Sequence, residues 1–164
     1  MAATSDITAD DSRGFAALER DHLRADWLAG FEWLAYDAPS PRNPLRVPLS
    51  QARVGLVDTS GAHETGTPPT GSSGRAALVG IDAGITFTHP GFDTERAAAD
   101  PEVVHPVATL QRLAAQGFIG DVAPVAVSVM GGVLIGQRLL DRGVPATVAA
   151  MRDQHVDLAL LVPA

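Results

Sequence analysis

The chain contains no cysteine among its 164 residues. It therefore has no disulfide, no thiolate metal site and no thiol nucleophile of its own. Aromatic residues are also scarce, at 5%, whereas 46% of the residues are hydrophobic. Because aliphatic side chains must then fill the interior, we expect one domain with an Ala-, Val- and Leu-rich core, as in many α/β folds.

Positive charge is in short supply, with 12 Lys and Arg against 19 Asp and Glu and a net charge of −7. Nucleic-acid phosphates and anionic membranes both select clustered positive charge, so neither partner is expected. No apolar run reaches the roughly 18 residues that cross a bilayer. The start of the chain lacks the basic and apolar regions of a signal peptide. We therefore expect a cytoplasmic protein.

The first third of the sequence differs in composition from the rest. Small polar and acidic residues predict a disordered tail over residues 1–11, followed by a single α/β domain over residues 12–164. Apolar residues at helical spacing predict an N-terminal amphipathic helix over residues 12–36, which either packs on the domain or forms a dimer contact. Four prolines in residues 37–50 predict an extended connector.

From residue 52 onward, segments of strand length alternate with segments of helical periodicity. The expected strands are 52–59, 76–81, 85–88, 124–130 and 156–164, and the expected helices are 94–99, 106–116, 133–142 and 145–154. Residues 62–75 are expected to form a loop, and Gly117 and Gly143 to cap two helices at their C-terminal ends. The alternation predicts a Rossmann-like, mostly parallel sheet with flanking helices.

The last stretch, residues 156–164, is a short apolar run of the kind that forms a buried parallel strand. In open α/β sheets, functional sites lie beyond the carboxyl ends of such strands. The sequence places Ser60, Gly61 and His63 after the first strand. It places His89 and Asp93 after the 85–88 strand. If these strands are parallel, both groups lie at the edge toward which the last strand points.

Imidazole and carboxylate groups together can perform acid–base catalysis, so His89 and Asp93 are the candidate catalytic residues. The alternative is a structural loop in which Asp93 caps the next helical turn. A third possibility is a metal-dependent enzyme that uses His63, His89 and Asp93, although no spacing in the sequence is diagnostic of a metal site.

Ser60, Gly61, His63 and Gly131 are the candidate substrate-binding residues, with backbone N–H groups that suit an anionic substrate such as a carboxylate. The surroundings of Ser60 do not form Gly-x-Ser-x-Gly, which argues against a serine hydrolase. Neither a Gly-x-Gly-x-x-Gly nor a Walker pattern occurs, so a nucleotide site is not supported and no cofactor is expected.

Several blocks occur in an order that resembles the selenoprotein B family of glycine, sarcosine, betaine and D-proline reductases. The most specific are His-Pro-Gly-Phe-Asp at residues 89–93 and Gly-Phe-Ile-Gly at residues 117–120. Others are residues 54–63, Val-His-Pro at 104–106, Ser-Val-Met-Gly at 128–131 and Val156 to Pro163. The resemblance covers about residue 25 to the end. It implies an α/β protein that cleaves a C–N bond reductively in a small amino-acid-like or carboxylate substrate.

In that family the reactive residue is a selenocysteine, or a cysteine in some relatives, just after the last strand. A selenol ionises near neutral pH and is a strong nucleophile, as a low-pKa thiolate is. This sequence departs from the pattern because it stops at Ala164, and because His105 stands where relatives usually have an aromatic residue.

We therefore hypothesise that the chain is truncated, and that a UGA selenocysteine codon after Ala164 was taken as a stop. As written, the chain is expected to be inactive because it lacks the redox nucleophile. The alternative is a non-catalytic binding or scaffold subunit that acts with a partner subunit or as a homo-oligomer.

Overall fold

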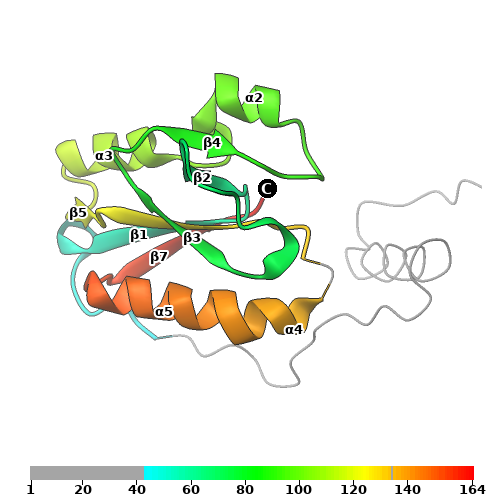
Figure 1. Cartoon of the computed structure of the whole chain (residues 1–164). Helices are drawn as coiled ribbons and strands as arrows, with labels where there is room; N and C mark the ends of the chain where they lie inside the picture. Colours follow the sequence, from blue (N-terminus) through cyan, green and yellow to red (C-terminus); the bar gives the residue numbers. More distant parts are fainter. Residues whose placement is uncertain (1–42, 134) are drawn as a thin grey trace, which may run out of the picture. The chain divides into compact units, whose positions relative to one another are not determined.

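The computed structural model describes residues 43–164 except residue 134, so the predicted tail and the predicted helix over 12–36 lie outside the described residues. The main sheet consists of β1 (Arg53–Asp58), β3 (Ala76–Gly80), β5 (Asp121–Val122), β6 (Val125–Val129) and β7 (Leu158–Val162). A separate two-stranded sheet contains β2 (Ala62–Glu64) and β4 (Ile85–Phe87) (Figure 1). Within the described part of the chain, no helix is long and apolar enough to cross a membrane.

Strand β1 lies at the centre of the main sheet. It pairs in parallel with β5 at its start, with β6 at its end, and with β7 over most of its length. Strand β3 pairs with β6 in the antiparallel direction and forms the far edge. The prediction of a mixed α/β fold with a mostly parallel main sheet is therefore confirmed.

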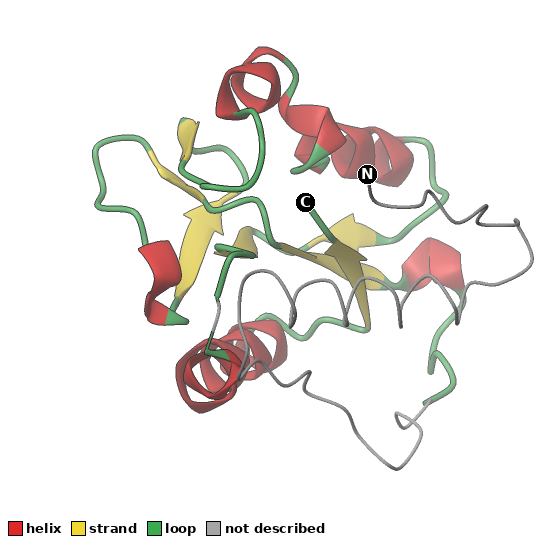
Figure 2. Ribbon diagram, turned by 90° about the vertical axis from the view of Figure 1, so that its right-hand side faces the viewer, coloured by secondary structure: helices red, strands yellow, loops and turns green. Residues whose placement is uncertain are grey.

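Helices cover both faces of this sheet (Figures 1 and 2). Helix α3 (Val107–Ala115) packs Leu110 into a core cluster with Val54 and Leu56 of β1. On the opposite face lies α5 (Val144–Asp153), whose Met151 sulfur would be only 2.5 Å from a Cβ on Gly55. Only glycine lets helix and strand approach so closely there.

The remaining helical segments are short. They are η1 (Leu49–Gln51), η2 (Gly71–Ser73), α2 (Thr94–Ala99), η3 (Pro101–Val103), α4 (Gly136–Arg138) and the π-helical η4 (Leu139–Gly143). The predictions of a helix at 94–99 and of a cap at Gly117 are confirmed, since Gly117 has a φ of 75° directly beyond α3. That left-handed conformation suits glycine.

The prediction that Gly143 ends a helix was wrong. Its φ of −69° is helical, and the chain runs without a break from α4 through η4 into α5. Glycine is needed there for space, because a Cβ would lie 2.7 Å from the carbonyl oxygen of Gly74. Pro145, two residues further on, has no N–H to donate to the preceding turn, which fits a π-helical stretch at this point.

The predicted loop over 62–75 also needs correction, because it begins with strand β2. Ala62, His63 and Glu64 pair antiparallel with Phe87, Thr86 and Ile85 of β4. The 85–88 segment is thus a strand, as expected, but it belongs to a two-stranded antiparallel sheet outside the main sheet. The three-residue length of β2 leaves too little alternation for its strand pattern to be recognised in sequence.

Strand β7 is parallel, as predicted, but it is not buried. It occupies the edge next to β1, and Leu158, Leu160 and Leu161 are 41%, 37% and 69% exposed. Pairing with Val54 and Leu56 places Leu158 and Leu160 on the α3 face, whereas Leu161 pairs with Val57 and lies on the opposite face. Within the described residues, both faces of this edge strand are therefore incompletely covered.

An exposed apolar edge strand without charged side chains is a template for association. We expect the purified chain to self-associate as its concentration rises, and Leu161→Lys to weaken this association by about tenfold or more, because charge opposes strand pairing at an edge. Light scattering over a dilution series measures it. Phe118→Lys is the matched control, since Phe118 is 62% exposed but lies off the sheet. Equal effects of both substitutions would contradict a role for β7.

Candidate functional site

The centre of the described domain is a buried polar network around Asp58, the last residue of β1. Asp58 is fully buried, and its Oδ1 accepts hydrogen bonds from the Ser60 backbone N–H at 3.0 Å, the Ser60 hydroxyl at 2.5 Å and the Ser128 hydroxyl at 2.6 Å. Its Oδ2 lies 2.8 Å from Nδ1 of His105, which is 3% exposed. Because carboxylate oxygens accept, Nδ1 of His105 carries the proton.

This network ties three distant parts of the chain together. Ser128 lies on β6 and also accepts the Ala62 N–H at 2.9 Å, while His105 lies between η3 and α3. Glu102 fixes that junction by accepting the N–H groups of Ala108 and Thr109 at 2.9 and 2.7 Å. Burial opposes ionisation of Glu102, but these bonds and the charge of Arg112 outweigh it and lower its pKa.

The turn after Asp58 carries the residues that face the sheet edge. The Gly131 N–H donates to the Thr59 carbonyl at 3.0 Å, and the Thr59 N–H donates to the Val162 carbonyl at 3.1 Å. The Thr59 hydroxyl accepts the Ala164 N–H at 2.8 Å. The segment after β7 is thereby held against the turn after β1, at the carboxyl edge of the parallel strands.

His89 lies beside this edge with one ring nitrogen bonded and the other not. Its Nδ1 accepts the Gly91 N–H at 2.9 Å, so the neutral ring carries its hydrogen on Nε2. Nε2 is buried and has no hydrogen-bond partner in the described structure. It lies 3.2 Å from the position that a Cβ on Gly131 would occupy, so only glycine leaves room beside it. Burial lowers the pKa of His89, because the charged imidazolium loses hydration.

Asp93 caps helix α2, as the structural alternative predicted. Its Oδ1 accepts the N–H groups of Glu95 and Arg96 at 3.0 and 3.3 Å. Oδ2 takes part in neither of these bonds. Phe92 precedes it, and its ring lies against the His89 ring with centroids 4.6 Å apart. Asp93 and His89 therefore lie near each other, because Phe92 precedes Asp93 and its ring contacts the His89 ring.

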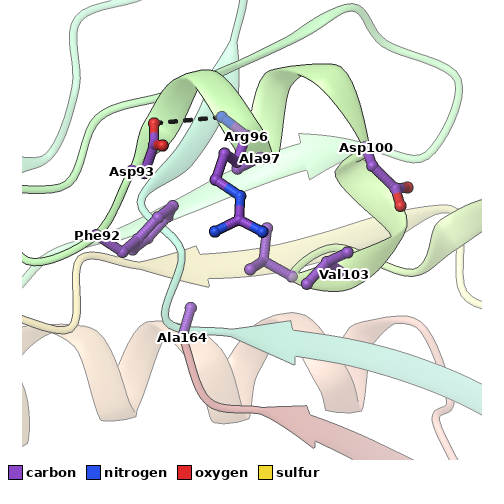
Figure 3. Close-up of a pocket in the computed structure, with 8 residues that line it drawn as sticks. Phe92, Asp93, Arg96, Ala97, Asp100, Val103 and Ala164 are labelled. Atoms are coloured by element: carbon purple, nitrogen blue, oxygen red, sulfur yellow. Dashed lines mark hydrogen bonds between the residues drawn. The ribbon is translucent and has the colours of Figure 1, made fainter.

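A pocket of about 450 Å³ opens between α2, η3 and the end of the chain (Figure 3). Its walls include Phe92, Ala97, Val104 and Ala164, together with the charged side chains of Asp93, Arg96 and Asp100. In Figure 3 the Arg96 guanidinium lies above Ala164, between Phe92 and Val103. The sequence did not single out Arg96 or Asp100. Their i, i+4 spacing on a short helical segment was the available signal.

The residues predicted to bind substrate through backbone N–H groups have those groups occupied. The Ser60 N–H donates to Asp58, the Gly61 N–H to the Val129 carbonyl, and the Gly131 N–H to Thr59. Gly61 instead serves a close approach, since its φ is 68° and a Cβ would lie 2.3 Å from the Thr88 carbonyl oxygen. These backbone N–H groups are thus paired within the protein in this arrangement, and a role of Ser60, Gly61 and Gly131 in substrate binding stays a prediction.

His63 is also engaged inside the protein. It is 7% exposed, and its Nε2 lies 3.1 Å from the Thr88 hydroxyl oxygen. His63, His89 and Asp93 were the possible metal ligands. Among residues 43–164, leaving out residue 134, no three His, Asp or Glu side chains are grouped so that they could hold a metal ion.

Comparison with known proteins gives one distant relative. The chain is 25% identical over 128 residues to the D-proline reductase subunit gamma of Acetoanaerobium sticklandii. The match covers 75% of this chain and 53% of the relative, so the chain spans about half the length of the relative. No family model matches the chain. No solved structure matches it either. These findings support a distant relationship to this reductase family.

The Asp58 network gives a first prediction. Asp58→Asn should lower the free energy of unfolding by about 3 to 5 kcal/mol, because removing one partner of a buried pair leaves the other groups unsatisfied. Urea denaturation followed by circular dichroism measures this. The control is Asp121→Asn, which removes a partly exposed ion pair with Arg53 at 3.0 Å and should cost no more than about 1 kcal/mol. Similar losses for both variants would contradict the central role of Asp58.

His89 gives a second prediction, on pH. In the unfolded chain its pKa is near the ordinary value of about 6.5, and in the folded chain it is lower. Below about pH 6.5 the unfolded state binds a proton that the folded state does not, so stability falls until the folded pKa is passed. His89→Asn should flatten this part of the stability profile. His155→Asn, at an exposed histidine, should leave it unchanged. An unaltered acid slope in His89→Asn would refute the assignment.

Proposed function

We propose that this chain is a subunit of the glycine, sarcosine, betaine and D-proline reductase type, and that its carboxyl sheet edge binds a small amino-acid-like or carboxylate substrate for reductive C–N cleavage. One observation carries the proposal. The segment that follows β7 is held by Thr59, and Ala164 in it lines a pocket whose wall includes Phe92, the ring that lies against His89. In the family that the sequence resembles, the redox residue follows this strand. The distant likeness to a D-proline reductase subunit supports the same reaction class.

Reductive cleavage of a C–N bond consumes two electrons and two protons and releases an amine. His89 suits a hydrogen bond to the reacting group of the substrate, because its Nε2 carries the hydrogen and lies at the edge without a partner among the described residues. The two protons come from the external dithiol, together with the electrons. Asp93 acts with His89 by capping α2 and so fixing the wall of the pocket. The electrons come from a selenol or thiol and an external dithiol, which this cysteine-free chain does not provide. We therefore infer that the chain binds substrate without turning it over.

The proposal predicts that the purified 164-residue chain, given D-proline or a glycine derivative and a dithiol, releases no ring-opened amino acid or amine. In a protein in which a selenocysteine or cysteine supplies the redox nucleophile, His89→Gln in this chain should lower kcat by about 100-fold or more, because removing one hydrogen-bond donor to the reacting group costs about that much. Chromatographic product analysis measures both. Thr147→Ala, on α5, is the control and should keep activity.

Turnover by the 164-residue chain would contradict the proposal. If instead the chain binds neither D-proline nor a glycine derivative, a non-catalytic binding or scaffold subunit is the better hypothesis, and the exposed leucines of β7 favour it as the second candidate. The metal-dependent alternative has no supporting cluster among the described residues.

A further inference from the structure

Arg96 places a positive charge inside the pocket between α2 and η3. Positions 93, 96, 97 and 100 share one face of the short helical segment, because residues three and four apart are neighbours on a helix surface. Ala97 is buried and anchors this face in a cluster with Phe87 and Val104. The Arg96 side chain is therefore directed along the pocket wall, as Figure 3 shows.

The charge of Arg96 is not neutralised within the described part of the chain. The ion pairs found there are Arg53 with Asp121 and His105 with Asp58, and Arg96 is in neither. Asp93 is nearby, but its Oδ1 is committed to the N-terminal turn of α2. Arg96 is exposed, so its guanidinium is open to a ligand that enters the pocket. A guanidinium in this position is suited to a carboxylate, which it can bind through two parallel hydrogen bonds.

The other charged side chains of the pocket limit the chemical class of the ligand further. Asp93 and Asp100 line the same pocket, so the lining carries one positive and two negative side chains. A multiply charged anion such as phosphate would be repelled by the two carboxylates. A ligand with one carboxylate and one cationic nitrogen can pair its carboxylate with the positive side chain and its nitrogen with the negative ones. Its aliphatic body then lies along Phe92, Ala97 and Val104.

We infer that Arg96 is the specificity-determining residue that binds the substrate carboxylate, with Asp100 facing the nitrogen end. This inference rests on the proposed function and deepens it. The pocket and His89 share the Phe92 ring, which is 4.6 Å from the His89 ring, centroid to centroid. A carboxylate held on Arg96 therefore keeps the rest of the ligand close to the wall that His89 supports.

Isothermal titration of the 164-residue chain tests the assignment without turnover. D-proline and D-prolinamide differ only in the carboxylate. Measuring both ligands on the unaltered chain and on Arg96→Met, which keeps the aliphatic part of the side chain, isolates the interaction between the guanidinium and the carboxylate. Arg96→Met should weaken D-proline binding by about tenfold to a hundredfold, the range of a charged hydrogen-bonded contact, and should leave D-prolinamide binding unchanged. Arg96→Lys should restore part of the affinity, since it keeps the charge and loses the fork.

Arg112→Met is the matched control, because Arg112 lies on α3 outside this pocket and bonds the Thr109 hydroxyl. It should bind D-proline as the unaltered chain does. Urea denaturation of each variant shows whether it is folded. The inference is overturned if Arg96→Met binds D-proline normally, or if the unaltered chain binds neither D-proline nor glycine.

A different result would contradict the proposed function rather than the assignment of Arg96. If cyclopentanecarboxylate, which lacks the nitrogen, binds as tightly as D-proline and still depends on Arg96, the carboxylate assignment to Arg96 stands. The pocket would then not select an amino acid, which contradicts both the role of Asp100 and the proposed C–N chemistry. Normal D-proline binding in Arg96→Met would leave the reductase proposal intact and remove Arg96 from it.

Discussion

The carboxylate of Asp58 is the interaction on which the rest of this domain depends. It accepts four hydrogen bonds from β6, from the turn after β1, and from the junction between η3 and α3. Burial of a carboxylate costs free energy unless hydrogen-bond partners surround it. The network therefore holds the domain together only as long as all of its members are present. Its consequence is geometric, since it sets the turn that carries Thr59 and, through Thr59, the position of Ala164 and Gly131.

The candidate site therefore depends on the buried centre of the domain for its position. A rigid, fully bonded centre supports an edge at which bonding is incomplete, with a buried imidazole nitrogen and a guanidinium that have no partner of their own in the described structure. Buried polar groups without a partner are rare in folded proteins, so the Nε2 of His89 indicates a place where a ligand or another segment supplies the partner, whereas the Arg96 guanidinium is exposed. The exposed leucines of β7 adjoin the same region, so the edge is also apolar and incompletely covered.

Much of the fold could be predicted because the signals were local. The apolar runs at β1, β6 and β7, the helical periodicity before Gly117, and the capping role of Asp93 depend on neighbours within a few residues. The errors came from non-local contacts. Gly143 resembles a helix cap in sequence, but its small size serves the approach to Gly74. Strand β2 depends on pairing with β4, and the candidate donors Ser60 and Gly61 depend on Asp58 and Val129.

The sequence by itself determined the α/β class, most strand and helix positions, the absence of a thiol nucleophile, and the reductase resemblance that the distant relative supports. Local propensity and composition suffice for these features, because each depends on one short segment or on the overall amino-acid composition. Only the tertiary structure decided that His105 partners Asp58, that β7 is an exposed edge, and that Arg96 enters the pocket. These contacts join residues that are far apart in the chain or face a cavity, and no periodicity in one sequence encodes which distant segment will lie opposite.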